Sequence, residues 1–77
     1  MTKRIENKVV VFNVERANRS VNGNPAFVFN TDRGAFRTQS DTNAAYRLEN
    51  DFVIGAVLDV EVTLICTPAG RVFDWKL

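Results

Sequence analysis

The sequence contains no histidine and a single cysteine, Cys66. The lack of histidine excludes the commonest general base, the usual serine and cysteine triads and most zinc sites. One cysteine cannot form an internal disulfide, and it fits a reducing compartment such as the cytoplasm. Cys66 alternates with Leu64 along a predicted strand, so we interpret it as a small core residue. Carboxylates are the remaining candidates for acid–base catalysis, and binding without catalysis is the remaining type of function.

Long apolar runs and glycine-rich loops are also missing. No run approaches the roughly 20 residues that a membrane span needs, and Met1 to Arg4 are not followed by the apolar segment of a signal peptide. The four glycines are scattered over turns and do not form a phosphate-binding loop. We therefore expect a cytoplasmic protein with no membrane contact and no cofactor.

The charges are nearly balanced over the whole chain but not along it. With 77 residues, 45% of them hydrophobic, the chain is expected to form a single domain, residues 1–77, with a small core. The net charge of +1 argues against strong non-specific binding of nucleic acid. Residues 1–40 carry seven basic and three acidic side chains, whereas residues 41–77 carry three basic and six acidic ones. This asymmetry indicates either a basic binding face or two charge sets facing each other.

The alternation of apolar and polar residues predicts a mainly β chain. The expected strands are residues 5–16, 26–31, 35–40, 58–66 and 71–77, with a short helix at residues 41–50, capped by Asp41 or Ser40, between the third and fourth strands. This is the element order of an OB-fold, and SH3-like barrels show similar orders. We predict a small five-stranded barrel-like domain that is OB-like or, alternatively, SH3-like.

Both expected hairpins have a preferred register. In the first hairpin, Thr31 opposite Gly34 places Phe29 against Phe36. In the second hairpin, Thr67 opposite Gly70 gives every apolar residue an apolar partner: Leu64 with Phe73, Val62 with Trp75 and Val60 with Leu77. The same register predicts an opposite-charge pair of Glu61 with Lys76 and makes the last residue part of the core sheet.

Aromatic and arginine side chains interleave in the first hairpin and provide the clearest indication of binding. OB-folds bind single strands on the second and third strands, where bases stack on aromatic rings beside arginine. The simpler interpretation, which we prefer, is that Phe27, Phe29 and Phe36 are core residues. Tyr46 on the helix is a candidate interface anchor. The candidate binding residues are Arg16, Arg19, Phe27, Arg33, Arg37 and Tyr46.

Carboxylates offer the only acid–base chemistry. Asp59 and Glu61 lie two residues apart on one strand face, and Asp74 can join them across the second hairpin. The preferred interpretation is a solvated strand face on which Lys76 and Thr63 are the partners. A metal-dependent hydrolase is therefore the weakest of the function classes, and we predict no enzymatic activity and no metal.

Two segments resemble small proteins encoded by phages of mycobacteria and related actinobacteria. They are Gly23-Asn24-Pro25 followed by AFVFNTDRGAFRTQSD, and TPAGRVFDW near the end, so the similarity covers residues 23–41 and 60–77. The resemblance implies a non-structural accessory protein that acts in the host cytoplasm by binding a host protein.

The leading prediction is therefore a non-enzymatic binding module whose partner is a host protein. The alternative is a binder of single-stranded nucleic acid whose arginines contact the phosphate backbone. The sequence does not decide whether the chain forms a homo-oligomer, because the exposed edges of a small sheet can pair between copies.

Overall fold

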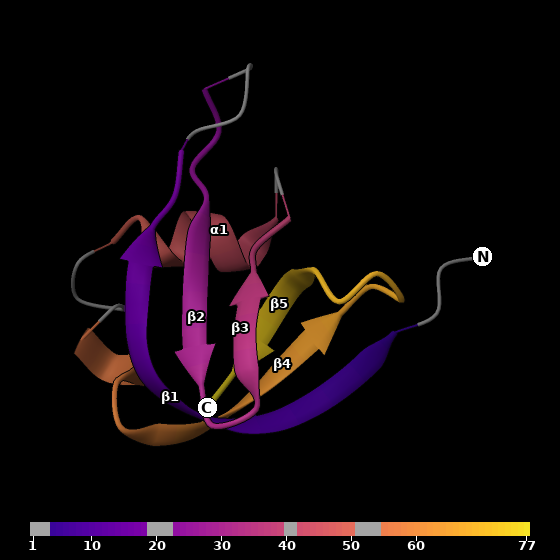
Figure 1. Cartoon of the computed structure of the whole chain (residues 1–77). Coiled ribbons are helices and arrows are strands. Elements are labelled where there is room, and N and C mark those ends of the chain that lie inside the picture. Colours follow the sequence, from indigo (N-terminus) through magenta and orange to yellow (C-terminus); the bar gives the residue numbers. More distant parts are fainter. Residues whose placement is uncertain (1–3, 19–22, 40–41, 51–54) are drawn as a thin grey trace.

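A computed structural model describes residues 4–18, 23–39, 42–50 and 55–77. The elements are β1 (Ile5–Arg16), β2 (Phe27–Thr31), β3 (Gly34–Arg37), α1 (Asn43–Leu48), β4 (Val60–Cys66) and β5 (Val72–Lys76). The strands form one antiparallel sheet in the order β3-β2-β1-β4-β5 (Figure 1). Residues 55–57 are also helical. The prediction of five strands, with a short helix between the third and fourth, is confirmed.

The first strand is the centre of the sheet. β1 pairs with β4 through its N-terminal half, where Val9 lies opposite Val62, and with β2 through its C-terminal half, where Val14 lies opposite Phe29. A bulge between Val11 and Asn13 interrupts the ladder of β1 with β2, and bulges bend a strand. Figure 1 shows β1 curving across the whole molecule. The curvature gives the sheet a concave side, which holds the core.

The core fills this concave side, and α1 closes one end of it (Figure 1). α1 contributes Ala44, Ala45 and Leu48, whose spacing of three and four places them on one helix face. All three are fully buried, as the sequence pattern predicted. The largest of the other fully buried side chains are Trp75, Phe27, Phe29 and Leu64. A helix of six residues is too short to be stable alone, so its stability depends on this packing.

The helix begins later than expected, and its cap is Thr42. Thr42 has extended backbone, and its Oγ1 accepts a hydrogen bond of 3.4 Å from the Ala45 N–H. Its own hydroxyl donates to the carbonyl oxygen of Gln39 at 2.8 Å. The prediction of Asp41 or Ser40 as the cap is therefore wrong, and both of these residues lie outside the described residues.

Replacing Thr42 by alanine is expected to lower the free energy of unfolding by about 1 kcal/mol, because the cap hydrogen bond is lost. Urea denaturation followed by Trp75 fluorescence measures this loss. Thr42→Ser keeps the hydroxyl and is the matched control, with an expected change of only a few tenths of a kcal/mol. Equal stability of the alanine and serine variants would contradict the assigned cap.

The first hairpin has the predicted register. Thr31 lies opposite Gly34 and Phe29 opposite Phe36. The Thr38 N–H donates to the Phe27 carbonyl at 2.9 Å, which extends the pairing beyond the end of β3. The alignment of β2 and β3 is therefore the one that the pairing of Phe29 with Phe36 predicted.

The second hairpin has a different register, and its predicted pairs are wrong. Trp75 lies opposite Leu64 and Lys76 opposite Thr63, with a bulge between Ile65 and Cys66. The turn is longer than expected, since the Thr67 N–H donates to the Arg71 carbonyl at 2.9 Å. Gly70, with φ of +82°, supplies the left-handed residue that such a turn requires.

The longer turn and the bulge change which side chains of β5 reach the core. Val72 and Trp75 are buried although they are three residues apart, and Phe73 between them is only half-buried. Leu77 is 69% exposed, so its predicted place in the core is wrong. Lys76 does not pair with Glu61, and its Nζ lies 3.7 Å from Glu6 Oε1.

Within the described residues, the two edge strands of the sheet meet at one bridge. An isolated parallel bridge joins Thr38, just after β3, to Val72, at the start of β5. The Gln39 N–H donates to the Val72 carbonyl at 2.7 Å. Both bridge residues are buried, so the residues on either side of them lie on the outer surface. We call the segments that meet here the seam: Arg37, Thr38 and Gln39 with Arg71, Val72 and Phe73.

Candidate binding surface at the seam

The structure separates the predicted binding residues. Phe27 is 1% exposed and Phe29 is fully buried, so neither ring can stack with a ligand, and Phe27 leaves the set of binding residues. The preferred interpretation as core residues is confirmed for Phe27 and Phe29, and Phe36 is partly buried against the same core. Arg33 lies in the turn between β2 and β3, at the opposite end of β3 from Arg37. Arg19 lies outside the described residues.

Two further predicted residues already have partners in the protein. The Arg16 guanidinium is 3.4 Å from Glu49 Oε2, and its Cζ lies 5.3 Å from the centroid of the Phe27 ring. The Tyr46 hydroxyl donates to Asn24 Oδ1 at 3.1 Å. Tyr46 is nevertheless 51% exposed on α1. Of the predicted arginines that the structure describes, Arg37 is the one that lines this hollow in the surface.

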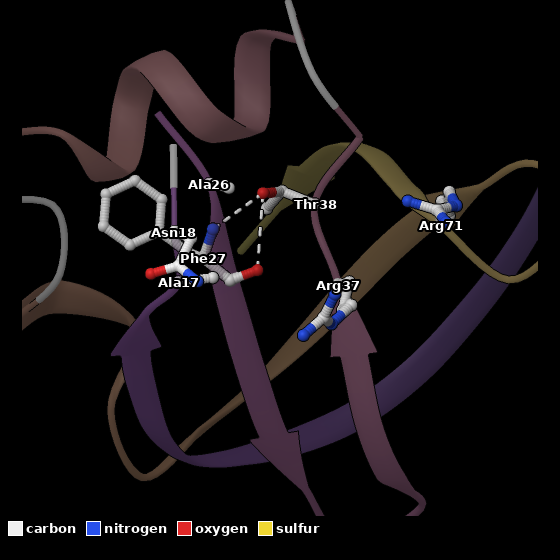
Figure 2. A pocket seen from close by; sticks show the side chains of 7 residues that line it. All are labelled: Ala17, Asn18, Ala26, Phe27, Arg37, Thr38 and Arg71. Carbon is white, nitrogen blue, oxygen red and sulfur yellow. Dashed lines mark hydrogen bonds between the residues drawn. The ribbon is translucent and has the colours of Figure 1, made fainter. Parts of the chain in front are cut away.

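This hollow, which we call the arginine hollow, has a volume of about 190 Å³ (Figure 2). It lies between the end of β1, the start of β2 and the seam, and its lining residues are Ala17, Asn18, Ala26, Phe27, Arg37, Thr38 and Arg71. Thr38 fixes its floor: the hydroxyl accepts a hydrogen bond of 2.9 Å from the Phe27 N–H and donates one of 3.3 Å to the Phe27 carbonyl. The floor is therefore held by side-chain as well as backbone hydrogen bonds.

Two arginines give the hollow its charge. Arg37 comes from β3 and Arg71 from the turn before β5, and both are exposed. Within the described part of the chain, neither forms an ion pair or a side-chain hydrogen bond. Unpaired guanidinium groups that face one hollow suit an anionic group, because each can donate two parallel hydrogen bonds. Sequence analysis missed Arg71, since only the bridge from Thr38 to Val72 brings it beside Arg37.

The carboxylates do not assemble into a site. In residues 4–18, 23–39, 42–50 and 55–77, no group of three or more possible metal-ligating side chains occurs. Asp74 lies 3.4 Å from the Arg47 guanidinium, and it lies opposite Ile65, four residues along β4 from Glu61. The arrangement gives no support to the hydrolase alternative.

Cys66 is buried, as the sequence pattern predicted. Burial raises the pKa of its thiol, and a hydrogen bond with Asn7 lowers the pKa in part. The raised pKa keeps the thiol protonated and poorly nucleophilic.

We expect Cys66 to react with a thiol reagent much more slowly in the native protein than in the unfolded protein at pH 8. The comparison of rates with and without denaturant measures this difference. Because the folded-state pKa is above the unfolded value, stability is also expected to fall as pH rises above about 8.5, and Cys66→Ala removes that part of the pH dependence. Equal rates in both states would contradict the burial.

Comparison with known proteins gives no assignment. No protein-family model matches the chain, and neither the curated proteins nor the solved structures contain a match. Among the described residues, no helix has the length and apolar character that a membrane crossing requires. The geometry of the seam is therefore what supports a function.

Proposed function

We propose that the chain is a non-enzymatic binding module, an OB-like barrel that binds single-stranded nucleic acid across the seam. The observation that carries the proposal is that two arginines, Arg37 and Arg71, line one hollow and form no ion pair with the described residues. The position of the hollow supports it. OB-folds bind oligonucleotides on the second and third strands, between the loop after the first strand and the loop between the last two. The arginine hollow lies between these same parts of the chain.

The element order supports the OB-like part of the proposal. In the sheet order β3-β2-β1-β4-β5, the outer strands are β3 and β5, and the parallel bridge from Thr38 to Val72 brings them together. A barrel closed between these strands has the connectivity of an OB-fold with its helix between the third and fourth strands. Here the helix α1 covers one end of the core, which leaves the outer side of β2 and β3 open to a ligand.

Phosphate is the anion that best fits the two arginines. Phosphate groups recur along a nucleic-acid strand, and guanidinium groups from two separate elements can hold one phosphate or two neighbouring ones. Asn18 at the edge of the hollow adds an amide that can donate to a phosphate or sugar oxygen. The small net charge of +1 predicts weak binding that is confined to this surface.

The second candidate function is binding to a host protein, as the phage resemblance implies. The observation that favours it is a group of exposed apolar side chains around the β1 bulge. Phe12 is 55% exposed, and Leu58 and Val60 are each 37% exposed in the segment that the Asp59 N–H joins to the Val11 carbonyl by a hydrogen bond of 2.7 Å. Exposed apolar side chains are enriched where proteins bind one another. This surface is separate from the arginine hollow, so the two functions can be tested independently.

Replacing Arg37 or Arg71 by alanine is expected to weaken binding to a labelled single-stranded oligonucleotide about tenfold at low salt, since each change removes charge-assisted hydrogen bonds. Fluorescence anisotropy over a range of salt concentrations measures the affinity. The slope of its logarithm against the logarithm of salt concentration is expected to become shallower by about 0.7 for each lost phosphate contact.

Arg33→Ala is the matched control, because it removes the same charge at the far end of β3. Its affinity is expected to stay close to that of the unaltered protein. If the oligonucleotide does not bind at low salt, or if all three variants lose the same affinity, the proposed function is wrong. Enrichment of a host protein that is lost in Phe12→Ser but retained in Arg37→Ala would support the second candidate instead.

A further inference from the structure

A second hollow lies on the other side of the bridge from the arginine hollow. Its volume is about 340 Å³, and its lining residues are Arg4, Gln39, Thr67 and Phe73. Gln39 and Phe73 follow the two bridge residues, just as Arg37 and Arg71 precede them. The two hollows therefore share the outer surface of the seam, one with two arginines and the other with an aromatic ring. We call the second one the ring hollow.

Phe73 is the extra residue of the bulge between β4 and β5, because Asp74 lies opposite Ile65 and Val72 lies opposite Cys66. Regular alternation from Val72 would place Phe73 outside and Asp74 inside, but the bulge leaves both of them half-buried and returns Trp75 to the core. Phe73 is thus an aromatic side chain on the surface of a small domain, next to exposed arginines. Its half-burial fixes the ring while it leaves part of the ring within reach of a ligand.

Arg4 covers the ring loosely. Its Cζ lies 5.5 Å from the centroid of the Phe73 ring. By contrast, Arg47 lies 3.9 Å from the Trp75 ring and also donates to the Trp75 carbonyl at 2.7 Å. Within the described residues, Arg4 has no such hydrogen bond or ion pair, and it is exposed just before β1. The Arg4 guanidinium can therefore move to admit a flat group beside the ring.

We propose that the ring hollow binds an unpaired nucleic-acid base, with Phe73 and Arg4 as stacking partners and Gln39 as a hydrogen-bonding partner. The proposal rests on the proposed function, and it adds that the ligand is recognised by its bases as well as by its phosphates. Every base has a flat face that stacks on an aromatic ring, and a guanidinium group can stack on the other side. A glutamine amide both donates and accepts, which suits the polar edge of a base.

The surroundings of the two hollows fit one strand that crosses the seam. Thr67 forms the wall of the ring hollow, and its hydroxyl accepts a hydrogen bond of 3.3 Å from the Arg71 N–H. The turn that shapes the ring hollow therefore also positions the backbone of a residue that lines the arginine hollow. In the proposed arrangement a phosphate lies at Arg37 and Arg71, and a neighbouring base lies beside Phe73 on the other side of the bridge. Duplex nucleic acid does not fit this arrangement, because its bases are stacked and paired.

The test compares a labelled oligo-dT strand with an abasic strand of the same length, by fluorescence anisotropy at low salt. The unaltered protein is expected to bind oligo-dT about tenfold more tightly than the abasic strand. Phe73→Leu is expected to remove this difference by weakening oligo-dT binding alone, whereas Phe73→Tyr, which keeps a ring, is expected to preserve it. Phe12→Leu is the matched control, because it removes an exposed ring away from the seam, and it is expected to change neither affinity.

The outcomes separate this inference from the proposed function. If the protein binds both strands equally well, or if Phe73→Leu and Phe73→Tyr give the same result, the inference is overturned while the proposed function stands. If neither strand binds, the proposed function is wrong, and the inference that rests on it is wrong as well. Trp75 fluorescence checks that each variant is folded. Should Phe73→Leu not fold, Arg4→Ala takes its place, with a selective loss for oligo-dT supporting the inference and an equal loss for both strands overturning it.

Discussion

Replacing Phe29 by alanine is expected to lower the free energy of unfolding by about 3–5 kcal/mol, the usual cost of a phenylalanine deletion in a core. Phe29 is fully buried, lies opposite Phe36 on one side and opposite Val14 on the other, and thereby joins three strands. Removing the ring would leave a cavity beside the central strand β1. The bulged backbone of β1 pairs with strands on both sides, so it cannot easily shift to fill the cavity. Little collapse of the surrounding structure is therefore expected.

For a domain of 77 residues, ordinary stability is about 4–11 kcal/mol, so this loss is large enough to populate the unfolded state without denaturant. Urea denaturation followed by the fluorescence of the single tryptophan, Trp75, measures it. Phe12→Ala makes the same chemical change at a side chain that is 55% exposed, and it is expected to cost less than about 1 kcal/mol. Similar losses for the two variants would contradict the placement of these rings.

Replacing Thr38 by valine is expected to lower the free energy of unfolding by about 1–3 kcal/mol, although the two side chains have almost the same shape. The Thr38 hydroxyl accepts from the Phe27 N–H at 2.9 Å, and both residues are buried. Valine would leave that N–H without its partner on a residue that is only 1% exposed, and an unpaired buried donor costs desolvation energy. The change also affects the floor of the arginine hollow.

Two measurements check the Thr38 variant. Urea denaturation gives the stability, and hydrogen exchange gives the protection of the Phe27 amide, which is expected to drop more than that of Phe29. Thr63→Val is the matched control, since Thr63 is half-buried on β4 and its hydroxyl forms no hydrogen bond within the described part of the chain. Its stability is expected to stay within about 0.5 kcal/mol. An unchanged Phe27 amide in Thr38→Val would show that the hydroxyl does not hold the seam.

The pattern of neighbouring residues was sufficient to predict the strands, the helix and the register of the first hairpin. The run of apolar residues in β1 predicted its bounds, because β-branched and aromatic side chains on both faces are typical of a central strand. In the first hairpin, a two-residue turn ending at Gly34 leaves few alternative alignments, and the pairing of Phe29 with Phe36 selects one of them. Sequence and structure agree where the information is contained within a few neighbouring residues.

The register of the second hairpin could not be predicted from the local residue pattern. Pairing each apolar residue with an apolar partner favoured a regular ladder, but a longer turn at Gly70 and a bulge shift the alignment. The burial of both Val72 and Trp75, three residues apart, is possible only with such an irregularity. Periodicity assumes a regular strand, so it assigned Phe73 to the core and did not recognise it as a surface ring.

The candidate site was harder to predict than the fold, because its residues come from segments that are far apart in the sequence. Arg37 was recognised from its alternation with phenylalanine, but Arg4, Gln39 and Arg71 have no local pattern that indicates binding. They come together only through the bridge between Thr38 and Val72 and through the position of β1 beside β4. The spacing of neighbouring residues does not indicate the long-range contacts that assemble the seam.

The central position of β1 also determines when the protein can fold during its synthesis. The N-terminal half of β1 pairs with β4, so that Ile5 lies opposite Cys66. Until β4 has left the ribosome, that half of the strand has no partner and its apolar side chains stay exposed. The pairing of the C-terminal half of β1 with β2 and the hairpin of β2 and β3 can form early, whereas contacts as distant in sequence as those of β1 with β4 are typical of slow folding. A nascent chain halted before Val60 is therefore expected to need a chaperone, whereas one that includes β5 can complete the sheet.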